Sequence, residues 1–367
     1  MAGAKKSQGV TKTRAISILG GVLCLVLIYI LGFSNFHGVE YNKADAEGRH
    51  ATTTAATPKA PALPPLDKAA YDKKLLSLAN RPVLATTTAS TTTNYLWPVT
   101  AAYPNPGAIL PFKRIVAYYG NFYSKGMGVL GEYPLDQVAA KLRAAVAEWQ
   151  VADPATPVVP AIDYIAITAQ ASPGADGKYR FRMPDSQIQI ALDLASQVNG
   201  IVFLDLQVGL SSLPVELPLI EKYLKMPQVH LALDPEFAMH NGAKPGTVVG
   251  TMSASDINYA ADYLAKLVRE NNLPPKVLVI HRFTHDMVTG YKSIKPLPEV
   301  QMVMDMDGWG SPAKKIGTYT RVIAPEPVQF TGFKIFYKND LKPPSTRIMT
   351  PAELLKLSPQ PSYIQYQ

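Results

Sequence analysis

Polar and charged side chains close several apolar runs in the second half of the chain. Carboxylates at the carboxyl ends of successive parallel strands build the active site of a (β/α)8 barrel. Each of these runs is apolar enough to be a strand buried on both faces. The pattern therefore indicates an enzyme site. The residues concerned are Asp205, Gln207, Asp234, Glu236, His281, Asp305, Asp307 and Trp309.

The spacing of the acids suggests which chemistry they perform. Residues two apart on a strand point to the same face, so we expect Asp234 and Glu236 to project together, about 6.6 Å apart along the strand. The same spacing joins Asp305 to Asp307. Like charges gathered at one place raise some carboxyl pKa values, which keeps one acid protonated near neutral pH. Such a set favours glycoside cleavage, in which one carboxyl group donates a proton and another stabilises the positive centre.

The elements that would position these residues alternate between strands and helices. Eight strands over about 255 residues match a (β/α)8 (TIM) barrel in size and count. An open doubly wound sheet is the alternative, but the loop 120–134 lacks the G-x-G-x-x-G spacing of a nucleotide site. The expected strands are 114–121, 158–168, 200–209, 229–237, 276–283, 300–308, 332–340 and 362–367. The expected helices are 134–150, 185–198, 213–226, 253–271, 311–322 and 350–357, with an irregular stretch at 284–298.

Two of the strand ends carry a resemblance. The segment LALDPE at 231–236 resembles the D-x-E ending of the fourth strand in family 18 (chitinase-type) glycoside hydrolases, and family 25 lysozymes carry a similar pair. The segment MVMDMDGWG at 302–310 resembles the M-x-Y-D stretch of family 18. The resemblance implies that Glu236 is the general acid, that Asp234 orients the substrate acetamido group and that Asp305 helps to hold it.

The remaining polar residues are candidate substrate contacts. We expect this role for Asp205, Gln207, Asp307, Trp309, His281 and Tyr119. Packing in the core is the alternative for the aromatic residues. Asp163, on the second strand, is as compatible with a structural role as with a functional one. Solvated loop positions are favoured over substrate contacts for Arg282, Lys338 and Asp340.

His281 leaves a second chemistry open. With the surrounding carboxylates it could hold a metal ion for a hydrolase or phosphodiesterase. Metal barrels usually supply several histidines, and only His281 and His285 lie in suitable places. A histidine hydrogen-bonded to a carboxylate is favoured, so we expect neither a metal nor a cofactor.

Charge and cysteine content narrow the function classes. The net charge is +8, and Lys5, Lys6, Lys12 and Arg14 supply half of it. The remaining excess is too diffuse for a nucleic-acid footprint, so we expect no nucleic-acid partner. Cys24 is the only cysteine, which excludes intrachain disulfides and cysteine-based zinc sites.

The beginning of the chain predicts a membrane anchor. Residues 15–33 carry no charge and are long enough to span a bilayer as a helix. The basic tail 1–14 places the N-terminus in the cytoplasm and the rest of the chain outside. A cleaved signal peptide and a lipid anchor at Cys24 are alternatives. Residues 34–110 are rich in Thr, Pro and Ala and predict an extended stalk, interrupted by a helix at 68–78. We expect Trp97, Tyr103 and the prolines near 104–111 to pack on the domain that follows.

Together these observations favour a membrane-anchored, extracytoplasmic barrel, residues 111–367, that hydrolyses a glycan of the cell envelope or its surroundings. The alternatives are a non-catalytic barrel that binds other envelope proteins or a glycan, and a metal-dependent hydrolase. A glycan is the expected ligand in the leading hypothesis, and residues 15–33 are the expected contact with the membrane.

Overall fold

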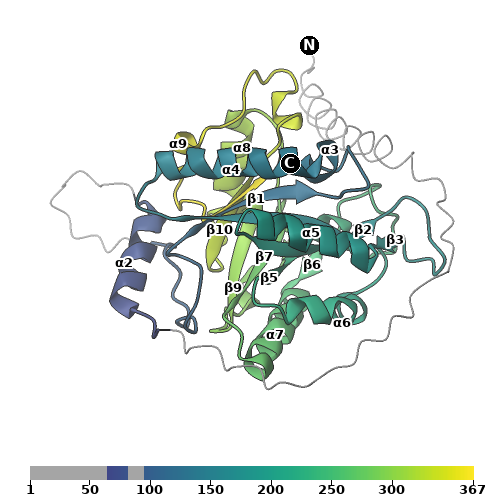
Figure 1. Ribbon diagram of the computed structural model, residues 1–367, viewed down its shortest axis with the longest axis horizontal. Coiled ribbons are helices and arrows are strands. Elements are labelled where there is room, and N and C mark those ends of the chain that lie inside the picture. Colours follow the sequence, from purple (N-terminus) through teal and green to yellow (C-terminus); the bar gives the residue numbers. More distant parts are fainter. Residues whose placement is uncertain (1–63, 82–94) are drawn as a thin grey trace, which may run out of the picture.

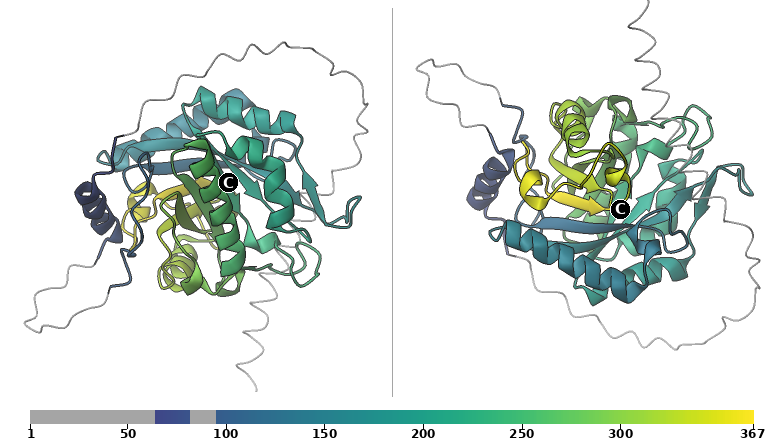
Figure 2. Two further views of the ribbon diagram at one scale, coloured as in Figure 1. Left: turned by 90° about the horizontal axis from the view of Figure 1, so that it is seen from below. Right: turned by 90° about the horizontal axis from the view of Figure 1, so that it is seen from above.

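Eight parallel strands close into a barrel in the computed structural model, which describes residues 64–81 and 95–367. Strand β1 pairs with β2 on one side and with β11 on the other, which closes the sheet. The expected barrel is confirmed, and Figures 1 and 2 show its helices packed around the strands. The barrel strands are β1 (Arg114–Gly120), β2 (Val158–Ala169), β4 (Ile201–Leu206), β5 (Val229–Leu233), β7 (Lys276–Arg282), β9 (Val300–Met306), β10 (Phe330–Ile335) and β11 (Tyr363–Tyr366).

Helices follow most of the strands, as expected. The longest are α4 and α7, with 18 residues each. The N-cap Ser253 of α7 forms a reciprocal capping box with Asp256, and Thr350 caps α9 in the same way with Glu353. The helices after the strands are α3 (Val129–Glu132), α4 (Leu135–Ala152), α5 (Asp185–Gln197), α6 (Leu213–Leu224), α7 (Ala254–Asn271), α8 (Pro312–Thr318) with the π turn η4 (Tyr319–Ile323), and α9 (Pro351–Leu354).

Shorter elements complete the barrel. The irregular stretch expected between β7 and β9 contains no α-helix. Strand β3 pairs with the end of β2 in the antiparallel direction, and β6 pairs with β8 in a small separate sheet. These elements are β3 (Arg180–Arg182), β6 (Met252–Ser253), β8 (Val288–Thr289) and the 3-10 turns η1 (Pro235–Phe237), η2 (His285–Met287), η3 (Tyr291–Ser293) and η5 (Asn339–Leu341).

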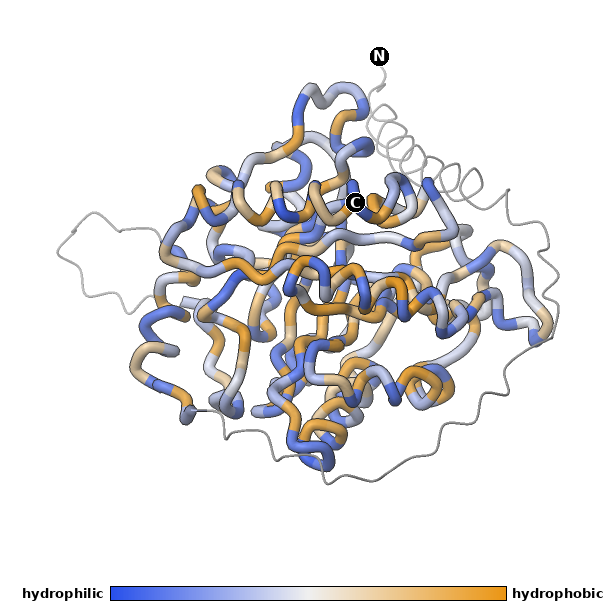
Figure 3. Tube along the Cα trace, in the orientation of Figure 1, coloured by the Kyte–Doolittle hydropathy of each residue, from blue (hydrophilic) through white to orange (hydrophobic). Residues whose placement is uncertain are grey.

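The strands bury different residues on their two faces. One apolar cluster lies between the strands and the surrounding helices, and a smaller one fills the barrel interior where the strands begin. Because side chains alternate along a strand, both faces of each strand are buried and the runs read as continuously apolar. Figure 3 shows this concentration of hydrophobic residues along the strands, with hydrophilic residues on the outer surface.

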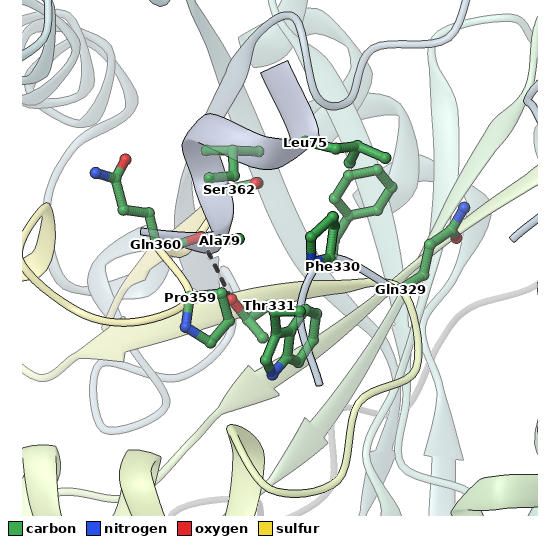
Figure 4. Close-up of a pocket in the computed structure, with 11 residues that line it drawn as sticks. Leu75, Ala79, Gln329, Phe330, Thr331, Pro359, Gln360 and Ser362 are labelled. Atoms are coloured by element: carbon green, nitrogen blue, oxygen red, sulfur yellow. Dashed lines mark hydrogen bonds between the residues drawn. The ribbon is translucent and has the colours of Figure 1, made fainter. Parts of the chain in front are cut away.

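The end of the barrel where the strands begin is covered by α2 (Lys68–Ala79) and by residues 95–112. Asn80 donates to the carbonyl oxygen of Leu357 (2.8 Å), and the Trp97 indole donates to that of Ala324 (2.7 Å). In Figure 4, Leu75 of α2 points toward Phe330 at the start of β10. These contacts hold α2 and residues 95–112 against the end of the barrel where the strands begin.

Helix α2 of the predicted stalk therefore lies on the barrel instead of extending away from it, while the expected contact of Trp97 with the barrel domain is confirmed. The helix expected at 68–78 is present, but Tyr71, Leu78 and Ala79 bury one of its faces. Composition averaged over the whole linker conceals these few apolar anchors. The boundary at residue 110 stays a prediction. The segment 15–33 and Cys24 lie outside the described residues, and no helix within 64–81 and 95–367 is long and apolar enough to cross a membrane.

Gln301 on β9 holds the covering segment in place. Its Oε1 accepts from the N–H groups of Ile109 (2.9 Å) and Leu110 (3.0 Å), and its Nε2 donates to the Leu110 carbonyl oxygen (2.6 Å). We expect Gln301→Leu to lower the free energy of unfolding by about 1–3 kcal/mol, because backbone groups remain buried without partners. Urea denaturation measures this loss. The exposed Gln189→Leu on α5 is the control and should change stability by no more than about 0.5 kcal/mol; equal effects would contradict the assigned role.

Candidate active site

The interior of the barrel changes from apolar to polar along the strands. In each strand, a polar residue follows a residue of the inner apolar cluster by two positions, or by four in the case of Lys334. Because side chains an even number of positions apart lie on the same face, these polar residues also point into the barrel. All of these side chains are buried. The polar layer at the carboxyl ends of the strands consists of Tyr119, Asp163, Asp205, Asp234, His281, Asp305, Lys334 and Gln365.

His281 lies at the centre of this layer. Its Nδ1 is 3.1 Å from Asp305 Oδ2 and 3.7 Å from Asp307 Oδ2, and its Nε2 is 3.3 Å from Asp205 Oδ2. Burial alone would lower the pKa of His281, but the contacts with Asp205, Asp305 and Asp307 raise it well above its usual value. The neighbouring carboxylates therefore favour the charged form of the buried imidazole. The favoured interpretation of His281, a histidine bonded to neighbouring carboxylates, is confirmed.

Lys334 is a second buried cation that the sequence interpretation missed. Its Nζ is 3.1 Å from Asp307 Oδ1 and lies 3.7 Å from the centre of the Tyr119 ring. Burial lowers its pKa, whereas Asp307, Asp234 and Asp305 raise it, and the net direction is upward. The available signal was a single lysine in the otherwise apolar run FKIF of β10, in phase with the inward-facing Phe330 and Gly332.

Asp234 is fixed by donors on both of its oxygens. Oδ2 accepts from Gln207 Nε2 (3.2 Å), and Oδ1 accepts from the Glu236 N–H (3.2 Å). Gln207 also contacts the Tyr119 hydroxyl (3.3 Å). Burial, followed by the nearby Asp205, raises the pKa of Asp234 to about 7. Asp234 is therefore a positioned carboxyl group that binds a proton near neutral pH.

The expected strand 229–237 ends earlier, at Leu233. Pro235 has no N–H to donate to a sheet, and Asp234 instead caps the 3-10 turn η1. Because residues 234–236 do not continue the strand, strand alternation does not set the positions of Asp234 and Glu236. The expectation that the two side chains project together from a strand is therefore wrong. The strands expected to reach 209 and 308 also end early, at Leu206 and Met306.

Glu236 differs from the other acids in its exposure. Its side chain is only half-buried, and within the described part of the chain its carboxyl group has no hydrogen bond or ion pair. Burial raises the pKa of Glu236 well above its usual value, and the carboxylates of Asp234 and Asp307 raise it further. The raised pKa favours the protonated form of Glu236, and its carboxyl group is not hydrogen-bonded to a protein acceptor among the described residues.

Asp305 lies deeper in the barrel. It is fully buried, and a Cβ on Gly332 of β10 would lie 2.5 Å from its Oδ1. Only glycine at 332 leaves this carboxyl group its space. Burial raises the pKa of Asp305, partly offset by its hydrogen bond with His281. A substrate at the barrel mouth would therefore meet Glu236 and Asp307 before it met Asp305.

Asp163 belongs to the same layer and joins it to the last strand. Its Oδ2 accepts from the Tyr363 hydroxyl (2.5 Å) and from Gln365 Nε2 (2.7 Å), while its Oδ1 accepts no hydrogen bond. Burial, followed by repulsion from Asp205, raises its pKa to about 7. Asp163 therefore contributes to the charge balance of the site from inside the barrel.

The raised pKa values predict how stability depends on pH. Asp163 and Asp234 have folded pKa values of about 7, above those of an unfolded chain, so their contribution is complete at low pH and is lost as the pH rises through about 7. We expect the thermal midpoint to fall as the pH rises from about 4, the pKa of an unfolded Asp, to about 7. Asp163→Asn, which cannot ionise, should flatten that slope in scanning calorimetry. The same slope in both proteins would refute the assignment.

The other predicted positions have different environments. Trp309 is half-buried just beyond β9, and Tyr119 lies inside the barrel. Lys338 is exposed and pairs with Glu132, as expected of a loop charge. For Arg282 and Asp340, the interpretation as solvated loop charges is wrong. Arg282 donates to carbonyl oxygens of the following loop, and Asp340 pairs with the buried Lys315.

No group of three or more His, Cys, Asp or Glu side chains among the described residues is arranged to hold a metal ion. His281 and three of its neighbouring carboxylates instead form hydrogen bonds and ion pairs with one another.

Comparisons with known proteins find only weak similarities to solved structures. No family model and no curated protein matches it. Among solved structures, a cellulase, Cel5C_n, is 13% identical, with a TM-score of 0.34 over 61% of this chain and 65% of that one. A ruminal GH26 endo-beta-1,4-mannanase is 10% identical, with a TM-score of 0.31 over 69% of this chain and 58% of that one.

A third solved structure, a protein called GH26C from a Muricauda species, is 11% identical, with a TM-score of 0.30 over 72% of this chain and 71% of that one. The chain spans less than two thirds of the length of the first two structures. The fold assignment rests on the strand pairing described above.

Proposed function

We propose that this chain is a glycoside hydrolase that cleaves a glycan, with Glu236 as the proton donor. The observation that carries the proposal is the position of Glu236. It is a half-buried carboxyl group in η1, just beyond β5, without a hydrogen bond or ion pair among the described residues, and burial followed by the nearby Asp234 and Asp307 raises its pKa. A protonated carboxylic acid that can reach an external oxygen is the group required to protonate a leaving sugar.

The second carboxylate of the reaction is best supplied by Asp307. It is slightly exposed, and a cation faces each of its oxygens, with Lys334 at 3.1 Å from Oδ1 and His281 at 3.7 Å from Oδ2. As Glu236 gives its proton to the glycosidic oxygen and the C–O bond breaks, the Asp307 carboxylate would face the positive charge that develops on the anomeric carbon.

The remaining predicted residues act in support of this pair. Asp305 holds the His281 ring from inside the barrel, so we assign it a positioning role in place of direct contact with sugar. Asp234 and Gln207 are hydrogen-bonded to each other, and we propose that they contact a substituent of the substrate. An acetamido group at this position is implied only by the resemblance to family 18. The proposed proton transfer from Glu236 does not depend on that group.

The location of this activity follows from the sequence alone. Residues 15–33 would anchor the chain in a membrane, with the barrel outside and envelope glycans within reach. A non-catalytic glycan-binding barrel is the second candidate, because Asp234, His281 and Asp305 are almost completely buried.

A panel of soluble glycans separates these two candidates. The full-length protein is incubated with neutral and acidic polysaccharides, and new reducing ends are measured over time. The hydrolase predicts a linear release from at least one polymer. Binding of a polymer without release of reducing ends would support the non-catalytic barrel and overturn the proposed function.

A further inference from the structure

Trp309 lies beside two lysine side chains at the mouth of the barrel. The Lys314 ammonium is 4.6 Å from the centre of its rings, and the Lys342 ammonium is 5.2 Å away. Lys314 is exposed, while Trp309 and Lys342 are half-buried. Trp309 follows Asp307 by two residues, so this group, the Trp309–lysine cluster, adjoins the proposed reaction centre.

A buried centre beneath the surface fixes the cluster. Asp340 accepts from the Gly310 N–H (2.9 Å), the Phe336 N–H (2.9 Å) and the Lys315 ammonium (2.6 Å). Gly310 follows Trp309, Lys315 follows Lys314, and Lys342 stands two residues after Asp340. These bonds of Asp340 thus tie together the two segments that carry the cluster, residues 309–315 and residues 340–342. Buried polar networks with satisfied partners hold such geometry rigidly.

The two ammonium groups leave their charge uncompensated. Throughout residues 64–81 and 95–367, neither Lys314 nor Lys342 has a carboxylate within ion-pair distance. Both lie close to the same ring, and hence within about one screening length, 8–10 Å, of each other. The nearby Lys338, in contrast, is neutralised by Glu132 at 2.6 Å. Two cations held together without an anion form a site that an anion would stabilise.

We propose that the Trp309–lysine cluster is a substrate subsite for an anionic sugar residue, so that the glycan is an acidic polysaccharide bearing carboxylate or sulfate groups. The aromatic edge would contact the sugar, and the two ammonium groups would pair with its charge. The subsite rests on the proposed function only for its link to cleavage, because binding can be measured without it.

Binding to matched polymers tests the subsite. The full-length Glu236→Gln protein, purified in mild detergent, is titrated with polygalacturonate and its carboxyl-reduced form, and with dextran sulfate and dextran. The double change Lys314→Met with Lys342→Met should weaken binding of an acidic polymer by about tenfold and leave the neutral polymers unaffected. The carboxylate and sulfate arms identify which group the cluster prefers.

The control removes the same charge elsewhere on the surface. Lys266→Met with Lys356→Met takes away two exposed lysines that are not near Trp309. This control should bind acidic polymers as the parent does. Equal weakening by both double changes would show nonspecific attraction to a basic protein and would overturn the subsite. Equal affinity of the parent for acidic and neutral polymers would overturn it as well.

The outcomes also separate the subsite from the proposed function. Cleavage of a neutral glycan by the native protein, unaffected by the changes at Lys314 and Lys342, would keep the hydrolase and reject the subsite. Selective binding of an acidic polymer by the cluster, with no cleavage of any glycan by the native protein, would keep the subsite and reject the hydrolase.

Discussion

Replacing Glu236 with glutamine should abolish glycan hydrolysis while leaving the fold intact. Glutamine has nearly the same shape as the protonated acid but cannot give its proton to the leaving oxygen. General acid catalysis contributes about 10²–10⁴-fold, and we expect kcat to fall by that factor. The thermal midpoint should stay the same or rise, because burial and the neighbouring Asp234 and Asp307 disfavour the charged form of Glu236.

The control for this change is Glu270→Gln. Glu270 is exposed near the end of α7 and forms only a long pair with Lys266 at 3.9 Å. It should leave both kcat and the thermal midpoint unchanged. Full activity in the Glu236 variant would reject the assignment of the proton donor. A large loss of stability in that variant would instead show that Glu236 has a structural role.

Replacing Lys334 with methionine should produce the largest loss of stability among changes at the site. The substitution removes the cation that faces Asp307 Oδ1 at 3.1 Å and leaves that carboxylate beside other acids. Breaking a buried ion pair by removing one partner costs about 3–5 kcal/mol. Urea denaturation at neutral pH measures this loss. Activity should fall as well, since Asp307 would lose its ion pair with Lys334.

Lys338→Met supplies the matched control, because Lys338 lies four residues further along and pairs with Glu132 at a comparable 2.6 Å, but in solvent. Exposed pairs contribute about 0–1 kcal/mol, so this variant should be nearly as stable as the native protein. Similar small losses in both variants would contradict the view that Lys334 balances the buried acids.

The fold could be predicted from the sequence because its signals are local. Eight apolar runs separated by helix patterns define a barrel, and caps such as Ser253 mark where helices begin. The acids at strand ends were visible for the same reason, since each directly follows its run. The early end of β5 was not predicted, because Asp234 and Pro235 form a 3-10 turn in place of further strand.

Features that depend on neighbouring strands could not be predicted in the same way. Lys334 became part of the site only when β10 was placed beside β9 and Asp307. The buried ion pair of Asp340 with Lys315 joins two segments that are separated in the sequence. From the sequence alone, Asp340 was therefore interpreted as a solvated loop charge. The packing of α2 on the barrel depends on a few apolar contacts that the linker composition conceals.

The most direct test of the central claim is a comparison of leaving groups. Two aryl glycosides of the cleaved sugar, one with an acidic phenol and one with a weakly acidic phenol, are hydrolysed by the native protein and by Glu236→Gln. A proton donor is needed only when the leaving group is poor. The proposed role predicts that the variant loses far more activity on the weakly acidic phenol than on the acidic one. Equal losses on both substrates would contradict it.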